Sequence, residues 1–113
     1  MPITSPQAAD RVFLQQLYSD PCFPDRVLDK GRAILVRLCE RIEAERPGDI
    51  TALYTLTRGS TEEFNALEEE FAAEGSGIET VAREKIVEEF WFVATAYGFT
   101  GADPEKLVAG RNW

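Results

Sequence analysis

The stretch DRVLDKGRAILVRLCERIEAE, residues 25–45, decides the fold that we expect for this chain. Its apolar residues recur every three or four positions, and this spacing brings them onto one face of an α-helix. They are Leu28, Leu35, Leu38 and Ile42, with Val27 and Ile34 widening the stripe. The pair Pro47-Gly48 then ends the pattern, because neither residue favours continuation of a helix. The stretch therefore predicts an amphipathic helix from about Asp25 to Glu45.

Gly31 lies within the apolar stripe of this predicted helix. A glycine in a helix interior costs about 1 kcal/mol relative to alanine. Its position on the apolar face therefore predicts that another helix approaches closely at this point.

The rest of the chain divides into similar segments between residues that end helices. We expect a first helix from Pro6 to Asp20-Pro21, because proline suits a first turn and the residue before a proline leaves the helical region. Further helices are expected from Ile50 to about Ala73, from about Ser76 to Tyr97, and from Asp103-Pro104 to Gly110.

The segment from Ile50 to Ala73 allows one helix or two. Its apolar period crosses Gly59-Ser60 without a change of phase, which favours one long helix. The sequence Ser60-Thr61-Glu62-Glu63 also matches a capping box, which would begin a second helix there. We expect one long helix with a weak middle.

No segment shows the alternation of apolar and polar residues that is typical of a strand. We therefore predict an all-α fold: a single domain over residues 1–113, built as a bundle of four main helices plus a short C-terminal helix. The predicted core includes Leu35, Leu38, Ile42, Phe64, Leu67, Phe71, Ile86 and Phe90.

Three aromatic residues carry further expectations. Trp113 is expected to pack back onto the core rather than serve as a recognition handle, because aromatic side chains bury a large area. Trp91 and Phe92 are neighbours that point about 100° apart on a helix, so one of them is expected at the surface.

The composition excludes several classes of function. The chain has no histidine, which removes serine–histidine–aspartate and cysteine–histidine nucleophiles, histidine zinc sites and di-iron bundles. It has no glycine-rich phosphate loop and no calcium loop. A net charge of −8 makes nucleic acid a poor ligand. No apolar run approaches the roughly 20 residues of a membrane helix, and the first residues lack the basic region and apolar core that are typical of a signal peptide. We expect a cytoplasmic protein without a cofactor.

The two cysteines form no metal-spaced pair. Cys39 is expected in the core and Cys22 in a loop between prolines. A disulfide between them is the less favoured alternative, because such bonds are rare in the cytoplasm.

The net negative charge comes entirely from one half of the chain. Residues 1–58 have eight basic and eight acidic residues, whereas residues 59–113 have four basic and twelve acidic ones. The functional interpretation is an acidic docking surface for a basic protein partner, formed by Glu62, Glu63, Glu68, Glu69, Glu70, Glu88 and Glu89. The simpler interpretation is two solvated helix faces.

A basic counterpart lies on the first long helix. Arg26, Lys30, Arg37 and Arg41 follow the spacing of one helical face. These cations are able to pair with the acidic helices within the chain or across a homodimer.

An alternative function uses carboxylates as metal ligands. Glu40 and Glu43 lie three residues apart, and Glu84 and Glu88 lie four residues apart, so each pair shares one helix face. Two such pairs that faced each other would hold magnesium, as in all-α nucleotide pyrophosphohydrolases. The weaker hypothesis is therefore a carboxylate-metal hydrolase acting on a phosphorylated small molecule.

Four segments of the chain resemble a known family. They are Val27-Leu28-Asp29-Lys30-Gly31, Leu38-Cys39-Glu40-Arg41-Ile42-Glu43-Ala44, Glu62-Glu63-Phe64-Asn65 and Ala96-Tyr97-Gly98-Phe99. The family consists of short acidic bacterial proteins that form a domain of unknown function. The resemblance covers nearly the whole chain, and it implies a bacterial single-domain protein without implying an activity or a site residue.

The leading hypothesis is therefore a small interaction protein whose acidic half binds a basic partner. Immunity proteins, antitoxins and acidic adaptors have this character.

Overall fold

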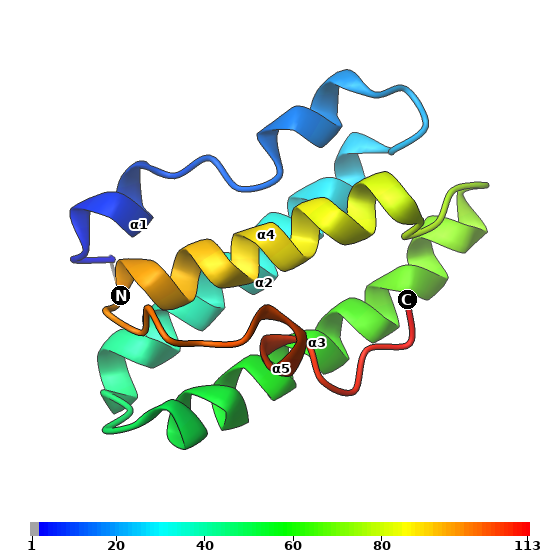
Figure 1. Ribbon diagram of the computed structural model, residues 1–113. Helices are drawn as coiled ribbons and strands as arrows, with labels where there is room; N and C mark the ends of the chain where they lie inside the picture. The colour runs from blue at the N-terminus through cyan, green and yellow to red at the C-terminus, as the bar shows by residue number, and fades with distance from the viewer. Residues whose placement is uncertain (1–2) are drawn as a thin grey trace.

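Three long helices form the body of the molecule (Figure 1). They are α2 (Asp25–Glu45), α3 (Ile50–Ala73) and α4 (Thr80–Ala96). The structure is a computed structural model that describes residues 3–113, and these residues include no strand. A short loop joins α2 to α3, so the two helices run antiparallel, and α4 passes in front of α2. The predicted all-α bundle is confirmed.

Shorter elements cover the two sides of this body. The N-terminal segment contains α1 (Pro6–Asp10) and the 3₁₀-helix η1 (Gln15–Ser19), which pack against α4 and α2 respectively. The short helix α5 (Pro104–Leu107) packs against α3 and α4, as Figure 1 shows. In the part of the chain that the structure describes, no helix has the length and apolar character needed to cross a membrane.

The continuous first helix that the sequence predicted is wrong. The segment breaks after Asp10 and resumes at Gln15, and Leu14 between them adopts a left-handed backbone conformation with φ of 60°. The Leu14 N–H donates to the carboxylate of Glu89 at 2.6 Å instead of to a carbonyl of its own helix. A tertiary hydrogen bond therefore interrupts a pattern that looked helical.

The segment from Ile50 to Ala73 is one helix, as expected. Ser60 and Thr61, the first two residues of the apparent capping box, are buried within the helix. The Thr61 hydroxyl lies 2.9 Å from the carbonyl oxygen of Thr57 and 3.3 Å from that of Leu107. This threonine therefore joins α3 to α5 rather than beginning a new helix.

The predicted core is confirmed at every position named. Leu35, Leu38, Ile42, Phe64, Leu67, Phe71, Ile86 and Phe90 are all buried. Phe64 lies at the centre, with its ring centroid 5.8 Å from that of Phe90 and 6.1 Å from that of Trp113.

Gly31 permits the close approach that the sequence predicted. A Cβ atom at this position would lie 3.0 Å from Cδ1 of Leu14, 3.4 Å from Phe64 and 3.5 Å from Leu67. The last two residues belong to α3, and Leu14 belongs to the N-terminal segment. The glycine therefore makes room for two elements at once.

The C-terminal tail folds back onto α3. Trp113 is 8% exposed, which confirms that it packs onto the core. The side-chain amide of Asn65 donates to the carbonyl of Gly110 at 3.1 Å and accepts from the N–H of Asn112 at 3.0 Å. The Asn65 side chain thus holds the tail at two points, Gly110 and Asn112.

The position of Phe64 predicts a large cost for its truncation. The substitution Phe64→Ala should lower the free energy of unfolding by about 3–5 kcal/mol, because it opens a cavity beside the rings of Phe90 and Trp113. Chemical denaturation measures this value. The exposed Val36→Ala on α2 is the control, and an equal effect of the two substitutions would contradict the burial of Phe64.

Candidate functional site

Ion pairs join the basic face of α2 to the acidic face of α3. Arg26 lies 2.6 Å from Glu74, Lys30 lies 2.5 Å from Glu70, and Arg37 lies 2.6 Å from Glu63. Arg41 also approaches Glu63, at 3.9 Å. All four cations of the predicted basic face therefore have partners within the same chain.

These pairs engage part of the predicted docking surface. Glu63 and Glu70 are each turned toward α2. Glu68 accepts a hydrogen bond from the N–H of Ile78 at 2.6 Å, just before α4 begins. Three of the seven predicted docking carboxylates thus hold elements of the fold together.

The assignment of Glu89 to an exposed docking surface is wrong. Its side chain is fully buried, with 0% exposure. Its carboxylate accepts hydrogen bonds from Nε of Arg11 at 3.0 Å, from a second guanidinium nitrogen of Arg11, and from the Leu14 N–H. The helical phase of Glu89 was the available signal, because it lies three residues after Ile86 and four before Val93, both of which are buried.

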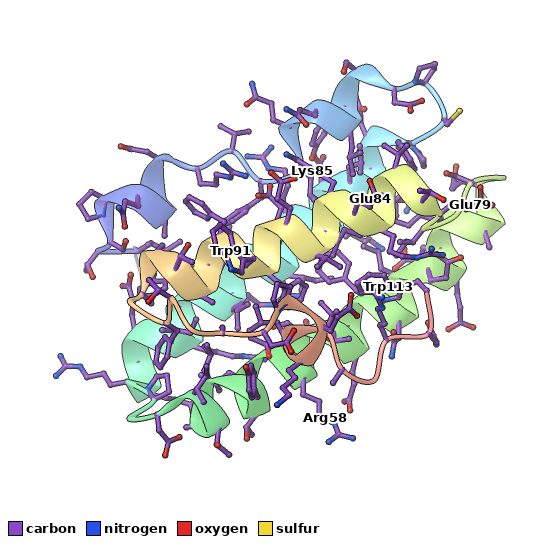
Figure 2. All side chains as sticks on the ribbon, viewed as in Figure 1. Arg58, Glu79, Glu84, Lys85, Trp91 and Trp113 are labelled. Atoms are coloured by element: carbon purple, nitrogen blue, oxygen red, sulfur yellow. The ribbon has the colours of Figure 1, made fainter. Side chains whose placement is uncertain are left out.

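The remaining docking residues are exposed. Glu62 and Glu69 lie on the outer side of α3, and Glu88 lies on α4, where its side chain is 60% exposed and 3.6 Å from Nζ of Lys85. The exposed residues Glu79 and Glu84 lie on or just before α4 (Figure 2).

The four carboxylates of the metal hypothesis are not gathered into a site. In residues 3–113, no group of three or more aspartate, glutamate or cysteine side chains is arranged to hold a metal ion. Glu40 and Glu43 lie on α2, whereas Glu84 and Glu88 lie on α4. The carboxylate of Glu43 is already occupied by hydrogen bonds from other parts of the chain.

Glu43, like Glu89, is a carboxylate on which several hydrogen bonds converge. It accepts from the N–H and hydroxyl of Thr4, both at 2.9 Å, from the N–H of Ser5 at 3.1 Å and from the hydroxyl of Tyr97 at 2.5 Å. It thereby ties the N-terminal segment and the end of α4 to α2. A surface hollow of about 470 Å³ lies beside it, lined in part by Arg37, Glu40 and Arg46.

The same contacts shift the pKa values of Glu43 and its neighbours. The hydrogen bond from Tyr97, followed by that from the Thr4 N–H, lowers the pKa of Glu43 from 4.5 to about 2. Burial and the neighbouring carboxylate of Glu43 raise the pKa of Tyr97. Burial also raises the pKa of the Cys39 thiol to about 12. A carboxylate this acidic, with its oxygens already bonded, makes a poor general base near neutral pH.

The cysteines agree with the expectations from the sequence. Cys39 is buried, Cys22 is exposed, and both are free thiols. With its raised pKa, the Cys39 thiol is protonated and inert near neutral pH.

Removing the partner of Glu89 should destabilise the fold strongly. The substitution Arg11→Met leaves a buried carboxylate without its cation, which typically costs about 3–5 kcal/mol. Urea unfolding measures the loss. The exposed Arg58→Met is the matched control and should stay within about 0.5 kcal/mol. Equal effects of the two would show that Arg11 contributes no more than a surface arginine.

The low pKa of Glu43 predicts a dependence of stability on pH. A carboxyl group with a lowered pKa stabilises the folded state above its ordinary pKa of 4.5, and this contribution disappears as the pH falls toward about 2. Glu43→Gln should therefore lower the melting temperature most above pH 4.5, and the difference from the parent should shrink on acidification. Thermal melts over this range test the prediction, with the exposed Glu45→Gln as control. A difference that stays constant with pH would contradict it.

Comparison with known proteins places the chain in a family but supplies no activity. No curated protein and no solved structure matches the chain. A family described as "Family of unknown function (DUF5713)" matches residues 7–113, which is nearly the whole sequence. The chain therefore belongs to this family of unknown function.

Proposed function

We propose that this chain is a small interaction protein that binds a basic protein partner through exposed carboxylates on α3 and α4. Immunity proteins, antitoxins and acidic adaptors work in this way. The proposal places the protein in the bacterial cytoplasm, where free cysteines such as Cys22 and Cys39 are the usual state.

The proposal rests on one observation from the described structure: the side chains of the basic face of α2 are paired within the chain, whereas several exposed glutamates are not. The cations of α2 are taken up by Glu63, Glu70 and Glu74. Among residues 3–113, the side chains of Glu62, Glu69, Glu79 and Glu84 are exposed and have no ion pair or hydrogen bond. The chain has a net charge of −8, and part of this charge therefore lies on carboxylates that are open to a partner.

Such carboxylates act mainly on association. A field of one sign steers an oppositely charged partner toward the surface and raises the rate of encounter. Charge complementarity also suppresses the wrong partners and determines the register of the complex. Exposed pairs add only about 0–1 kcal/mol each, so the complex also needs apolar contacts.

Charge reversal tests the proposal. We expect the chain to capture a basic protein from a bacterial lysate at low salt, and to lose it when added salt reduces the Debye length below about 10 Å. A variant with Glu62→Lys, Glu69→Lys, Glu79→Lys and Glu84→Lys should fold, because exposed substitutions change stability little, but should not capture this partner.

Arg58→Glu is the matched control for this experiment, because Arg58 is exposed on α3 one turn before Glu62. This variant should retain the partner. Capture of proteins that are not basic, or capture that survives the four reversals with the same salt dependence, would overturn the proposal.

A further inference from the structure

One side of α4 is exposed at the surface of the described structure. Val81, Glu84, Glu88 and Trp91 follow each other at intervals of three, four and three residues, which places them on one helical face. Val81 is 63% exposed and Trp91 is 45% exposed. Figure 2 shows Glu84 and Trp91 on α4, where this helix passes in front of the rest of the bundle. We call these four residues the α4 stripe.

The two sequence neighbours of Trp91 have aromatic packing partners within the fold, whereas Trp91 has none among the described residues. Phe90 is fully buried against Phe64. Phe92 packs edge-on against Phe13, with a ring centroid separation of 6.2 Å, and the guanidinium carbon of Arg11 lies 4.4 Å from the Phe92 ring centroid. Within residues 3–113, the Trp91 ring makes no aromatic, cation–π or hydrogen-bond contact. The sequence expectation that one of the pair Trp91 and Phe92 lies at the surface is therefore met by Trp91.

An exposed tryptophan beside carboxylates has the composition of an interaction surface. Tryptophan is enriched among the residues that carry most of the binding energy at protein interfaces. The stripe combines two apolar residues at its ends with two carboxylates between them. Its ends are ten residues apart, which is about 15 Å along a helix.

We propose that the α4 stripe is the docking site for a basic amphipathic helix of another protein. Trp91 and Val81 receive apolar side chains of that helix, and Glu84 and Glu88 pair with its lysine or arginine residues. This inference rests on the proposed function and assigns it a surface. The described residues offer no strand edge for strand addition, whereas an exposed helical face with apolar and acidic residues suits the packing of one helix on another.

Charge decides between a basic partner and a second copy of this chain. A symmetric dimer through the α4 stripe would bring Glu84 and Glu88 of both copies into one desolvated strip. Lys85 is the nearby cation, but its side chain is only 13% exposed and already lies 3.6 Å from Glu88. Like charges placed together across an interface oppose association, so a cationic occupant fits better than a copy.

Selection from a phage-displayed library of random peptides tests the inference without a known partner. We expect the chain to enrich peptides that carry lysine or arginine on one helical face and a large apolar residue beside them. A synthetic peptide of the enriched sequence should gain helical circular dichroism on binding, and fluorescence anisotropy measures its affinity.

Variants of the α4 stripe locate the binding site. Trp91→Ala should weaken binding of the peptide by about tenfold or more, as expected for a central aromatic residue. The double substitution Glu84→Lys and Glu88→Lys should weaken it similarly and remove its salt dependence. Trp91→Lys is a second test if the alanine variant folds poorly, because the lysine stem retains some packing on the helix surface while its positive charge opposes a basic peptide.

The matched control is Glu45→Lys on α2, an exposed carboxylate outside the proposed surface, which should leave the affinity unchanged. Reversal of Glu62 and Glu69 on α3 should weaken peptide binding less than reversal of Glu84 and Glu88. If the basic peptides no longer bind when Glu62 and Glu69 are reversed, but bind the α4 variants normally, the α4 assignment would be overturned. The proposed function would still stand. Selection of peptides that are not basic, or no enrichment over the chain with reversed charges, would overturn both. Self-association abolished by Trp91→Ala, without peptide binding, would identify the occupant as a second copy and also overturn the inference.

Discussion

The buried carboxylate of Glu89 is the constraint on which the N-terminal half of the structure depends. A charge removed from water must be compensated by close donors, or the fold loses several kcal/mol. Here the donors come from Arg11 and from the N–H of Leu14, which is 75 residues away in sequence. These bonds place the N-terminal segment on α4 and break it at Leu14. The side chain of Leu14 then reaches Gly31 of α2, so one carboxylate links three elements.

Two other polar side chains act in the same way at the ends of the bundle. Glu43 gathers Thr4, Ser5 and Tyr97 onto the last turn of α2. Asn65 holds the C-terminal tail so that Trp113 covers Phe64. Gly31, Glu43, Asn65 and Tyr97 all lie in the segments by which the chain resembles its family. In this molecule, these four residues of the resembling segments therefore serve to hold the fold together.

Internal pairing changes the meaning of the acidic half. Much of its charge balances the cations of α2 or satisfies backbone donors, as for Glu70 and Glu68. A glutamate paired in this way is not available to a partner. The surface that remains is smaller than the whole acidic half, and on α4 it includes an exposed tryptophan. In the interaction that we propose, steering by charge and anchoring by an apolar group are therefore separable.

Sequence alone was enough to predict the three long helices, the ends of α2 and α3, the named core residues and the class of the fold. Helical periodicity and helix-ending residues are local signals, and they placed α2, α3 and α4 and identified Phe64 as buried. Which carboxylates are free depends on how the helices pack. Glu62 and Glu63 are adjacent in sequence, yet one points to solvent and the other pairs with Arg37. The break at Leu14 was equally hidden, because its cause is a hydrogen bond to Glu89. Such contacts depend on which helix faces meet, and local sequence does not contain that information.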